Sequence, residues 1–264
     1  MNITLSGKRA VVSGSTSGIG YAIVAGLALA GAHVILNGRE GGRVDEAVRR
    51  LKADIPEAAV EGIAADLGTA DGVAAFLAKA PAVDILVNNL GIYEHKPFFD
   101  IQDEDWESFF SINVLSGVRL SRHYLPGMIE RGWGRIVFVS SESGVQIPVD
   151  MIHYGMTKTA QLAISRGLAE LAAGSGVTVN AVLPGPTRSE GVGRLVADMA
   201  RTQGKTEAEV EAAFFATARP SSLIKRFAEV EEVANLVVYA CSEQASATTG
   251  AALRVDGGIV RSIV

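Results

Sequence analysis

Short runs rich in aliphatic and β-branched residues alternate with longer helical patterns along almost the whole chain. We predict strands at residues 10–13, 33–37, 59–64, 85–88, 135–140, 177–183 and 252–255. We predict helices at residues 19–30, 44–53, 72–79, 104–130, 157–174 and 229–240. Strands that alternate with helices in this way form a parallel sheet covered on both faces, with right-handed connections. The predicted fold class is therefore α/β, a doubly wound seven-stranded parallel sheet of the Rossmann type.

The size of the chain fits a single domain with this fold. Its 264 residues lie within the range of one large α/β domain, and hydrophobic residues make up 48% of them. No repeat, low-complexity segment or linker interrupts the alternation. We therefore predict one Rossmann-type domain over residues 1–264.

One long segment departs from the alternation. Residues 184–227 carry no strand pattern, although residues 192–199 and 207–215 show helical patterns. A long insertion after the carboxyl end of a strand lies where open α/β sheets bind their ligands. We interpret residues 186–227 as a lid over a substrate, and a peripheral helical addition is the alternative.

Charge and apolar content argue against several classes of partner. The formal net charge is -5 and no basic run is present, which argues against a nucleic-acid partner. The longest apolar stretch, from Ala22 to Ala32, is too short to cross a bilayer and is interrupted by glycines. The segment from Met1 to Arg9 lacks the apolar core of a signal peptide. We expect a cytoplasmic protein with no membrane partner.

Cysteine and histidine content bears on metal binding and disulfides. The only cysteine, Cys241, lies in an apolar stretch, so we expect a buried thiol and no internal disulfide. None of the four histidines forms a pair with metal-ligand spacing. No metal site is predicted.

The first predicted strand ends in a glycine-rich turn that leads directly into a helix. The turn reads Ser13-Gly14-Ser15-Thr16-Ser17-Gly18-Ile19-Gly20. Its glycines permit backbone angles and a close approach that side chains would obstruct. The free amides and the dipole at the start of the helix favour a pyrophosphate. A strand before the turn and a helix after it are the context in which such a turn binds a dinucleotide.

A tyrosine and a lysine are spaced for proton transfer. Tyr154 and Lys158 are one helical turn apart, on the same face of a helix. A lysine cation there stabilises a tyrosinate and lowers the pKa of the phenol from its usual value near 10. Such a tyrosine can exchange a proton with a carbonyl/alcohol pair near neutral pH. Ser141, upstream of the pair, is the third member of this set.

The Gly-x-x-x-Gly-x-Gly spacing of the turn resembles that of the short-chain dehydrogenase/reductase family. The resemblance extends from Gly7 to about Gly258. Besides the turn, it includes Asn88-Asn89-Leu90-Gly91, Asn113, the Ser141/Tyr154/Lys158 set and Pro184-Gly185. Two residues depart from the family pattern. Ser13 replaces a threonine, and Leu90 replaces an alanine close to where the adenosine half of a cofactor is expected.

The resemblance implies a role for each residue of the set. Tyr154 would be the general acid/base, and Ser141 would hydrogen-bond the substrate carbonyl. Lys158 would bind the nicotinamide ribose, and Asn113 would help to hold a water that connects the lysine to solvent. Ser140 is expected to point away from Ser141, because adjacent residues of a strand face opposite sides. The residues expected to contact the cofactor are Gly14, Ser15, Thr16, Ser17, Gly18, Ile19, Gly20, Asn37, Arg39, Asp66, Leu67, Asn89, Leu90, Gly91, Tyr154, Lys158, Pro184, Gly185 and Thr187.

The end of the second predicted strand bears on the choice of cofactor. Gly38 stands where NAD-preferring relatives carry an aspartate, and Arg39 offers a planar charged donor for a 2′-phosphate. We therefore favour NADP(H) over NAD. The alternative is that Arg39 is a solvated loop charge, offset by Glu40. Asp66 and Leu67 resemble the pair that contacts adenine, and a helix N-terminal cap is the alternative.

Three aromatic residues lie near the predicted site. Tyr93 is expected to line the pocket wall, and His153 is a weaker candidate for contact with the substrate. Trp106 is expected in core or subunit packing. The resemblance implies a homotetramer.

These observations favour one activity over its rivals. We expect an NADP(H)-dependent carbonyl reductase or alcohol dehydrogenase that acts on a small-molecule ketone or secondary alcohol, with a 3-oxoacyl-carrier-protein reductase-like activity as one assignment. The alternatives are an NAD-dependent sugar, polyol or sterol dehydrogenase and a non-catalytic cofactor-binding regulatory protein. The sequence does not identify the substrate.

Overall fold

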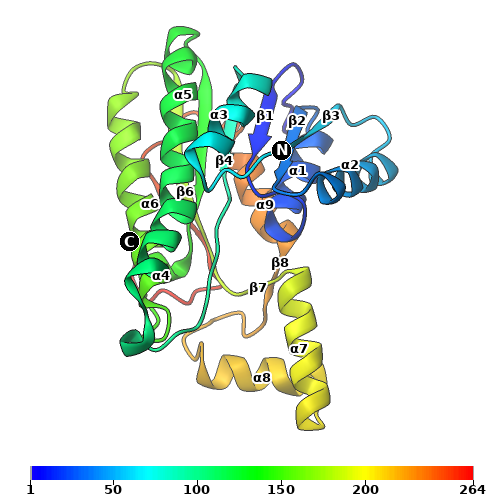
Figure 1. Ribbon diagram of the computed structural model, residues 1–264, viewed down its shortest axis with the longest axis vertical. Helices are drawn as coiled ribbons and strands as arrows, with labels where there is room; N and C mark the ends of the chain where they lie inside the picture. The colour runs from blue at the N-terminus through cyan, green and yellow to red at the C-terminus, as the bar shows by residue number, and fades with distance from the viewer. Residues whose placement is uncertain (1, 264) are drawn as a thin grey trace.

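The structure, a computed structural model, describes residues 2–263. Within them, seven parallel strands form one sheet in the order β3-β2-β1-β4-β5-β6-β9 (Figure 1). The strands are β1 (Arg9–Val12), β2 (His33–Gly38), β3 (Val60–Ala64), β4 (Ile85–Asn88), β5 (Gly134–Val139), β6 (Val177–Pro184) and β9 (Ala252–Val255). The predicted doubly wound, seven-stranded parallel sheet is confirmed.

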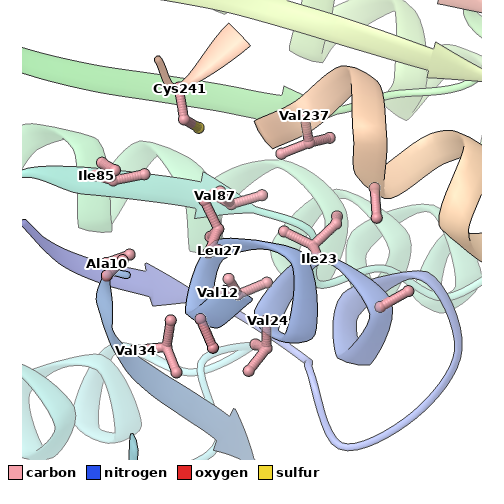
Figure 2. Close-up of a cluster of buried hydrophobic side chains, with 14 of the residues drawn as sticks. Ala10, Val12, Ile23, Val24, Leu27, Val34, Ile85, Val87, Val237 and Cys241 are labelled. Atoms are coloured by element: carbon pink, nitrogen blue, oxygen red, sulfur yellow. The ribbon is translucent and has the colours of Figure 1, made fainter. Parts of the chain in front are cut away.

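Helices cover both faces of the sheet. One face carries α1 (Gly18–Leu29), α2 (Gly41–Asp54) and α9 (Val230–Ala240), and the other carries α3 (Ala70–Lys79), α5 (Ser116–Glu130) and α6 (Ile152–Leu171). Successive strand residues face opposite sides, so Val12 packs in one core and Val11 in the other. Figure 2 shows the first core, where side chains of α1 meet those of β1, β2 and β4. Cys241 is fully buried in this core, as predicted.

The predicted helix over residues 104–130 is interrupted. The structure has α4 (Asp103–Phe110), a π-helical turn, η2 (Ser111–Leu115), and then α5. Single π turns of this kind are frequent at functional sites. The helix predicted over residues 157–174 is also corrected, because α6 begins at Ile152 and so includes Tyr154. Short 3₁₀ turns are η1 (Phe98–Asp100), η3 (Glu142–Gly144) and η4 (Glu243–Ala245).

The insertion, residues 186–227, forms a small unit at one end of the sheet (Figure 1). It contains β7 (Thr187–Arg188), α7 (Glu190–Gln203) and α8 (Glu207–Thr217), and β8 (Ala228–Glu229) follows it. Both helices were predicted, but the pairing of β7 with β8 was not. Two-residue strands leave no periodic pattern in a sequence. The insertion has its own core, which consists of Val196, Ala200, Val210, Phe215 and Phe227.

No helix within residues 2–263 is long and apolar enough to cross a bilayer. In the same range, no group of three or more His, Cys, Asp or Glu side chains could hold a metal ion.

Candidate active site

The strand order changes direction between β1 and β4, and ligands of open α/β sheets bind at such a point. Here the glycine turn lies against the segment that follows β4. The Ser13 hydroxyl accepts hydrogen bonds from the backbone amides of Asn89 and Leu90, both at 3.0 Å. The Asn89 side-chain amide donates to the carbonyls of Ser13 and Gly14. The turn therefore depends on the hydroxyl of Ser13. Threonine carries the same group, so the replacement of threonine by serine keeps these hydrogen bonds.

The start of α1 can hold an anion. Ser17 is the N-cap residue, and its hydroxyl makes no capping bond. Gly14 and Gly18 have φ angles of 61° and 57°, in the region that favours glycine. A Cβ at Gly14 would lie 3.1 Å from Leu90, so no larger residue fits there without movement. Open first-turn amides beside a cavity suit a phosphate.

A continuous cleft runs from this turn to the predicted catalytic residues. The cavity along the turn shares Ile19, Asn89 and Gly91 with a second cavity, which contains Tyr154 and Lys158. Of the residues predicted to contact the cofactor, those that line these two cavities are Gly14, Ser17, Gly18, Ile19, Gly20, Asn89, Leu90, Gly91, Tyr154, Lys158, Pro184, Gly185 and Thr187. The cleft therefore brings together most of the predicted set.

Three side chains predicted to contact the cofactor are instead used within the fold. The buried Ser15 hydroxyl donates to the Val12 carbonyl at 2.7 Å. The Asn37 amide donates to the carbonyls of Ile63 and Ala65, and its oxygen accepts from Gly14. Leu67 is 1% exposed and lies in the core. These side chains stabilise the turn and the strands, and a cofactor contact by the same residues stays a prediction.

Asp66 forms a turn of its own. One carboxylate oxygen accepts from the Gly68 amide at 3.0 Å. The N-cap of α3 is Thr69, whose hydroxyl accepts from Gly72. The capping alternative for Asp66 is therefore wrong.

The end of β2 leaves Arg39 free. Arg39 is exposed and has no ion pair within residues 2–263. A Cβ at Gly38 would lie 2.6 Å from Cγ2 of Thr16, so any larger residue there, aspartate included, would require the Thr16 side chain to shift. The packing of these side chains thus favours glycine at this position.

Ser141, Tyr154 and Lys158 meet in the second cavity. Ser141 caps η3, beside the end of β5, and its hydroxyl is hydrogen-bonded to the Tyr154 phenol. The Lys158 ammonium lies 5.5 Å from the centre of the Tyr154 ring and donates to the Val139 carbonyl at 3.0 Å. Ser140 instead donates to the backbone carbonyl of Lys158. Its side chain is therefore engaged in packing α6 against β5.

Burial dominates the ionisation of the pair. Burial raises the pKa of Tyr154 to about 12, and the hydrogen bond from Ser141 opposes this. Burial lowers the pKa of Lys158 to about 7. The resemblance implies a depressed phenol pKa, whereas burial in this structure raises it. A neutral phenol is the form that can donate a proton to a ketone.

Asn113 lies behind the cleft, in the π-helical turn. Its side chain pairs with both backbone groups of Ile92, at 2.7 and 2.9 Å, and donates to Thr157 at 3.0 Å. These bonds fix the loop that carries Gly91 against α6. The Asn113 backbone carbonyl accepts from the Gln161 amide at 2.6 Å, and the Gln161 oxygen accepts from Lys158 at 3.2 Å. The sequence analysis missed Gln161, although it follows Lys158 by three residues and shares its helix face.

A third cavity, of about 680 Å³, lies under the insertion and suits a small organic molecule. It shares Tyr93, Ser141 and Tyr154 with the second cavity. Its apolar wall from the insertion consists of Val192, Leu195, Val196, Met199, Val210, Phe214, Ala218 and Phe227. The insertion therefore covers the catalytic side chains, as a lid would.

The polar wall of this cavity contains two pairs that the sequence analysis missed. Glu142, next to Ser141, accepts from Arg219 at 3.0 Å, and His95 pairs with Asp150 at 2.7 Å. Glu142 is 3% exposed, and burial raises its pKa although Arg219 opposes the shift. Glu142 could have been predicted as a residue of the site, because it directly follows Ser141 in the sequence.

The three aromatic candidates have separate positions. Tyr93 lines the cleft and packs edge-on against Tyr154, with ring centres 6.4 Å apart. His153 is fully buried, packs against Phe109 and Trp106, and does not line the cleft. Contact between His153 and a substrate is therefore excluded in this structure. Trp106 is half-buried against His153, and its place in a subunit contact stays a prediction.

Known proteins are similar to this chain in sequence and in fold. A family model described as enoyl-(acyl carrier protein) reductase matches residues 14–260. The chain is 48% identical over 263 residues to the uncharacterized oxidoreductase YvaG of Bacillus subtilis, with 100% of both covered. It is 35% identical over 262 residues to dehydrogenase/reductase SDR family member 4 of Bos taurus, which covers 96% of this chain and 88% of that protein. The crystal structure of L-sorbose reductase from Gluconobacter frateurii, complexed with NADPH and L-sorbose, has a TM-score of 0.92 and 34% identity, with 100% of both chains covered. The chain belongs to the short-chain dehydrogenase/reductase family of NAD(P)-dependent oxidoreductases, which act on hydroxyl and keto groups.

Proposed function

We propose that the protein is an NADP(H)-dependent carbonyl reductase or alcohol dehydrogenase that interconverts a ketone and a secondary alcohol. The observation that carries the proposal is the position of Ser141, Tyr154 and Lys158. Ser141 and Tyr154 line both the cavity that continues from the glycine turn and the cavity under the insertion, and Lys158 lines the first of these two. A cofactor and a substrate bound on the two sides would meet at these side chains.

The nicotinamide supplies or accepts the hydride when it is bound. Tyr154, held as a neutral phenol by burial, gives its proton to the developing alkoxide during reduction. Ser141 orients the substrate oxygen beside that phenol, and Lys158 holds a positive charge close to it. Apolar side chains of the insertion line this cavity, and a cover that reduces contact with water would strengthen these interactions.

NADP(H) is the proposed cofactor, and NAD is the alternative. The Ser17 hydroxyl and the first-turn amides of α1 would hold the pyrophosphate. Arg39, free of ion pairs in the described part of the chain, would hold the 2′-phosphate. The crystal structure of L-sorbose reductase with NADPH is consistent with this choice.

We infer a small hydroxylated ketone as the substrate class. The Glu142–Arg219 and His95–Asp150 pairs offer hydrogen-bonding groups close to Ser141 and Tyr154. Among the described residues, Arg219 is the arginine or lysine on this wall, and it is paired with Glu142, so the wall offers no unpaired basic side chain to an acidic carrier protein. The likeness to L-sorbose reductase supports the same class over a 3-oxoacyl-carrier-protein substrate.

The experiment is a panel of sugar ketones, simple ketones and 3-oxoacyl thioesters, each assayed with NADPH and with NADH. Tyr154→Phe should lower turnover at least about a hundredfold, the lower range for general acid–base catalysis, and leave cofactor binding intact. Tyr124→Phe is the matched control, since this buried phenol donates to the Ala80 carbonyl away from the site. Equal turnover of Tyr154→Phe and the parent would remove Tyr154 from this role. It would favour the non-catalytic alternative if no substrate reacts with either.

Two further properties are proposed from membership of the family. We propose a homotetramer, which sedimentation velocity would test. We also propose a cytoplasmic location, which cell fractionation would test.

A further inference from the structure

A buried side-chain amide connects two residues of the predicted proton path. Gln161 is 1% exposed and Lys158 is 4% exposed. The Gln161 oxygen accepts from the Lys158 ammonium at 3.2 Å, and its nitrogen donates to the Asn113 carbonyl at 2.6 Å. Among the described residues, the other hydrogen-bond partner of the ammonium is the Val139 carbonyl, at 3.0 Å.

The chemistry at both ends fixes the orientation of this amide. An ammonium can only donate and a carbonyl can only accept. A Gln161 amide turned by 180° would place its nitrogen against Lys158 and its oxygen against the carbonyl, and both contacts would be repulsive. The π-helical turn positions the Asn113 carbonyl that selects this orientation.

We propose that Gln161 is a positioning residue, which fixes the Lys158 ammonium beside Tyr154 and stabilises its charged form. This inference rests on the proposed function, because it concerns the same proton transfer. An amide has no proton to release near neutral pH, so the direct connection between Asn113 and Lys158 orients the lysine and does not conduct protons. Asn113 acts one step further away, by holding the amide.

Other groups around the pair would stay the same in a variant of Gln161. The charged groups that act on Tyr154 are Glu142 of η3 and Arg219 of the insertion, and Tyr93 is the titratable group from the loop after β4. Burial is the cause that lowers the pKa of Lys158. A change at position 161 therefore alters one hydrogen bond to the ammonium and none of these charges.

The test is a titration of Lys158 by NMR in protein with ¹³Cε-labelled lysine, assigned by the signal lost in Lys158→Met. Gln161→Met keeps the length of the side chain and removes both hydrogen-bonding groups. A hydrogen bond to a charged group changes an equilibrium by roughly ten- to a hundredfold, so the pKa of Lys158 should fall by about one unit or more. Gln161→Glu keeps an acceptor and adds a charge, so it should raise this pKa.

The control is Ser165→Ala, a buried residue of the same helix whose hydroxyl has no hydrogen-bond partner among the described residues. It should leave the Lys158 titration unchanged. Parent-like titration of Lys158 in Gln161→Met, or in Gln161→Glu if the first variant does not fold, would overturn the proposal. A loss of thermal stability without a shift would mean that Gln161 is a packing residue only.

Turnover supplies an independent measurement. In Gln161→Met kcat should fall, because the Lys158 side chain is no longer held in place beside Tyr154. KM should change less than kcat. The NMR titration needs neither substrate nor cofactor. If the parent protein has no hydride-transfer activity, the proposed function is refuted, and the titration still decides whether Gln161 stabilises the charged form of Lys158.

Discussion

The sheet and the insertion lie on two sides of the same cleft, and they differ in whether their positively charged side chains are paired with carboxylates. The sheet side buries the Lys158 ammonium with backbone and amide acceptors and, among the described residues, no carboxylate partner. Arginines of the insertion are paired with carboxylates, in the pairs Arg188–Glu211, Arg194–Glu190, Arg201–Asp198, Arg219–Glu142 and Arg226–Glu232. A buried, unneutralised charge is tolerated only where the surrounding structure is stable enough to offset its cost.

The two regions also differ in how their backbones are held. The sheet has a large core on each face, and the polar side chains of Ser13, Asn37 and Asn89 fix its turns. The insertion has a core of five buried residues. Small units with few buried contacts open at lower free energies than the rest of a protein. This difference suits a rigid cofactor side and a substrate side that opens.

The largest expected effect concerns the buried charge. Between about pH 7 and the ordinary lysine pKa of 10.5, the folded protein binds fewer protons at Lys158 than the unfolded chain does. Burial of the charged Lys158 side chain therefore lowers the free energy of unfolding at and below pH 7, and this destabilisation disappears as the pH rises towards 10.5. Lys158→Met removes this destabilisation. The difference in unfolding free energy between variant and parent should change by as much as ~3 kcal/mol between about pH 7 and about pH 10, in favour of the variant at low pH.

Urea denaturation of both proteins across this range measures that difference. Tyr154 does not disturb the comparison, because its raised pKa acts only above its ordinary value of 10.0. A difference that stays constant with pH would show that Lys158 is not desolvated in solution. The sheet side would then resemble the insertion in leaving its charges solvated or paired.

The next effect compares one glycine from each region. A Cβ at Gly20 would lie 2.5 Å from the Asn89 amide and 2.6 Å from the Gly14 carbonyl, whereas a Cβ at Gly193 in α7 meets nothing within 4 Å. Gly20→Ala should destabilise the protein by about 2 kcal/mol and weaken cofactor binding, because overpacked sites must shift. Gly193→Ala should stabilise it by up to ~1 kcal/mol through helix propensity. Thermal unfolding checks both signs, and equal effects at the two sites would contradict the difference in packing.

The same contrast explains what could be predicted from the sequence. All seven strands and the glycine turn were predicted, because strands buried on both faces, such as β4, β5 and β6, form continuous apolar runs, and because the turn has its own local chemistry. The start of α6 was missed because Gly155 has low helix propensity. Its place in the helix is set by packing, since a Cβ there would lie 2.6 Å from Ile147.

Parts of the site depend on contacts that no local pattern contains. Glu142 and Arg219 are 77 residues apart and meet only because the insertion folds back over η3. The π-helical turn at Asn113 has the apolar pattern of an ordinary helix, so its altered hydrogen bonds cannot be predicted from periodicity. Gln161 is different, because its spacing from Lys158 places it on the same helix face. It could have been found from the sequence.

The smallest expected effect tests whether the sheet side alone selects the cofactor. Arg39→Leu should weaken NADPH binding about tenfold and leave NADH binding unchanged, because one charge-assisted hydrogen bond to a 2′-phosphate is lost. Arg49→Leu is the matched control, since this exposed arginine of α2 pairs with Glu46. Fluorescence titration with each cofactor measures the ratio of the two dissociation constants. An unchanged ratio in Arg39→Leu, or tighter binding of NADH than of NADPH by the parent, would mean that the exposed Arg39 is only a solvated charge. Residues elsewhere along the cleft would then have to distinguish NADPH from NADH, and the insertion would be the next region to test.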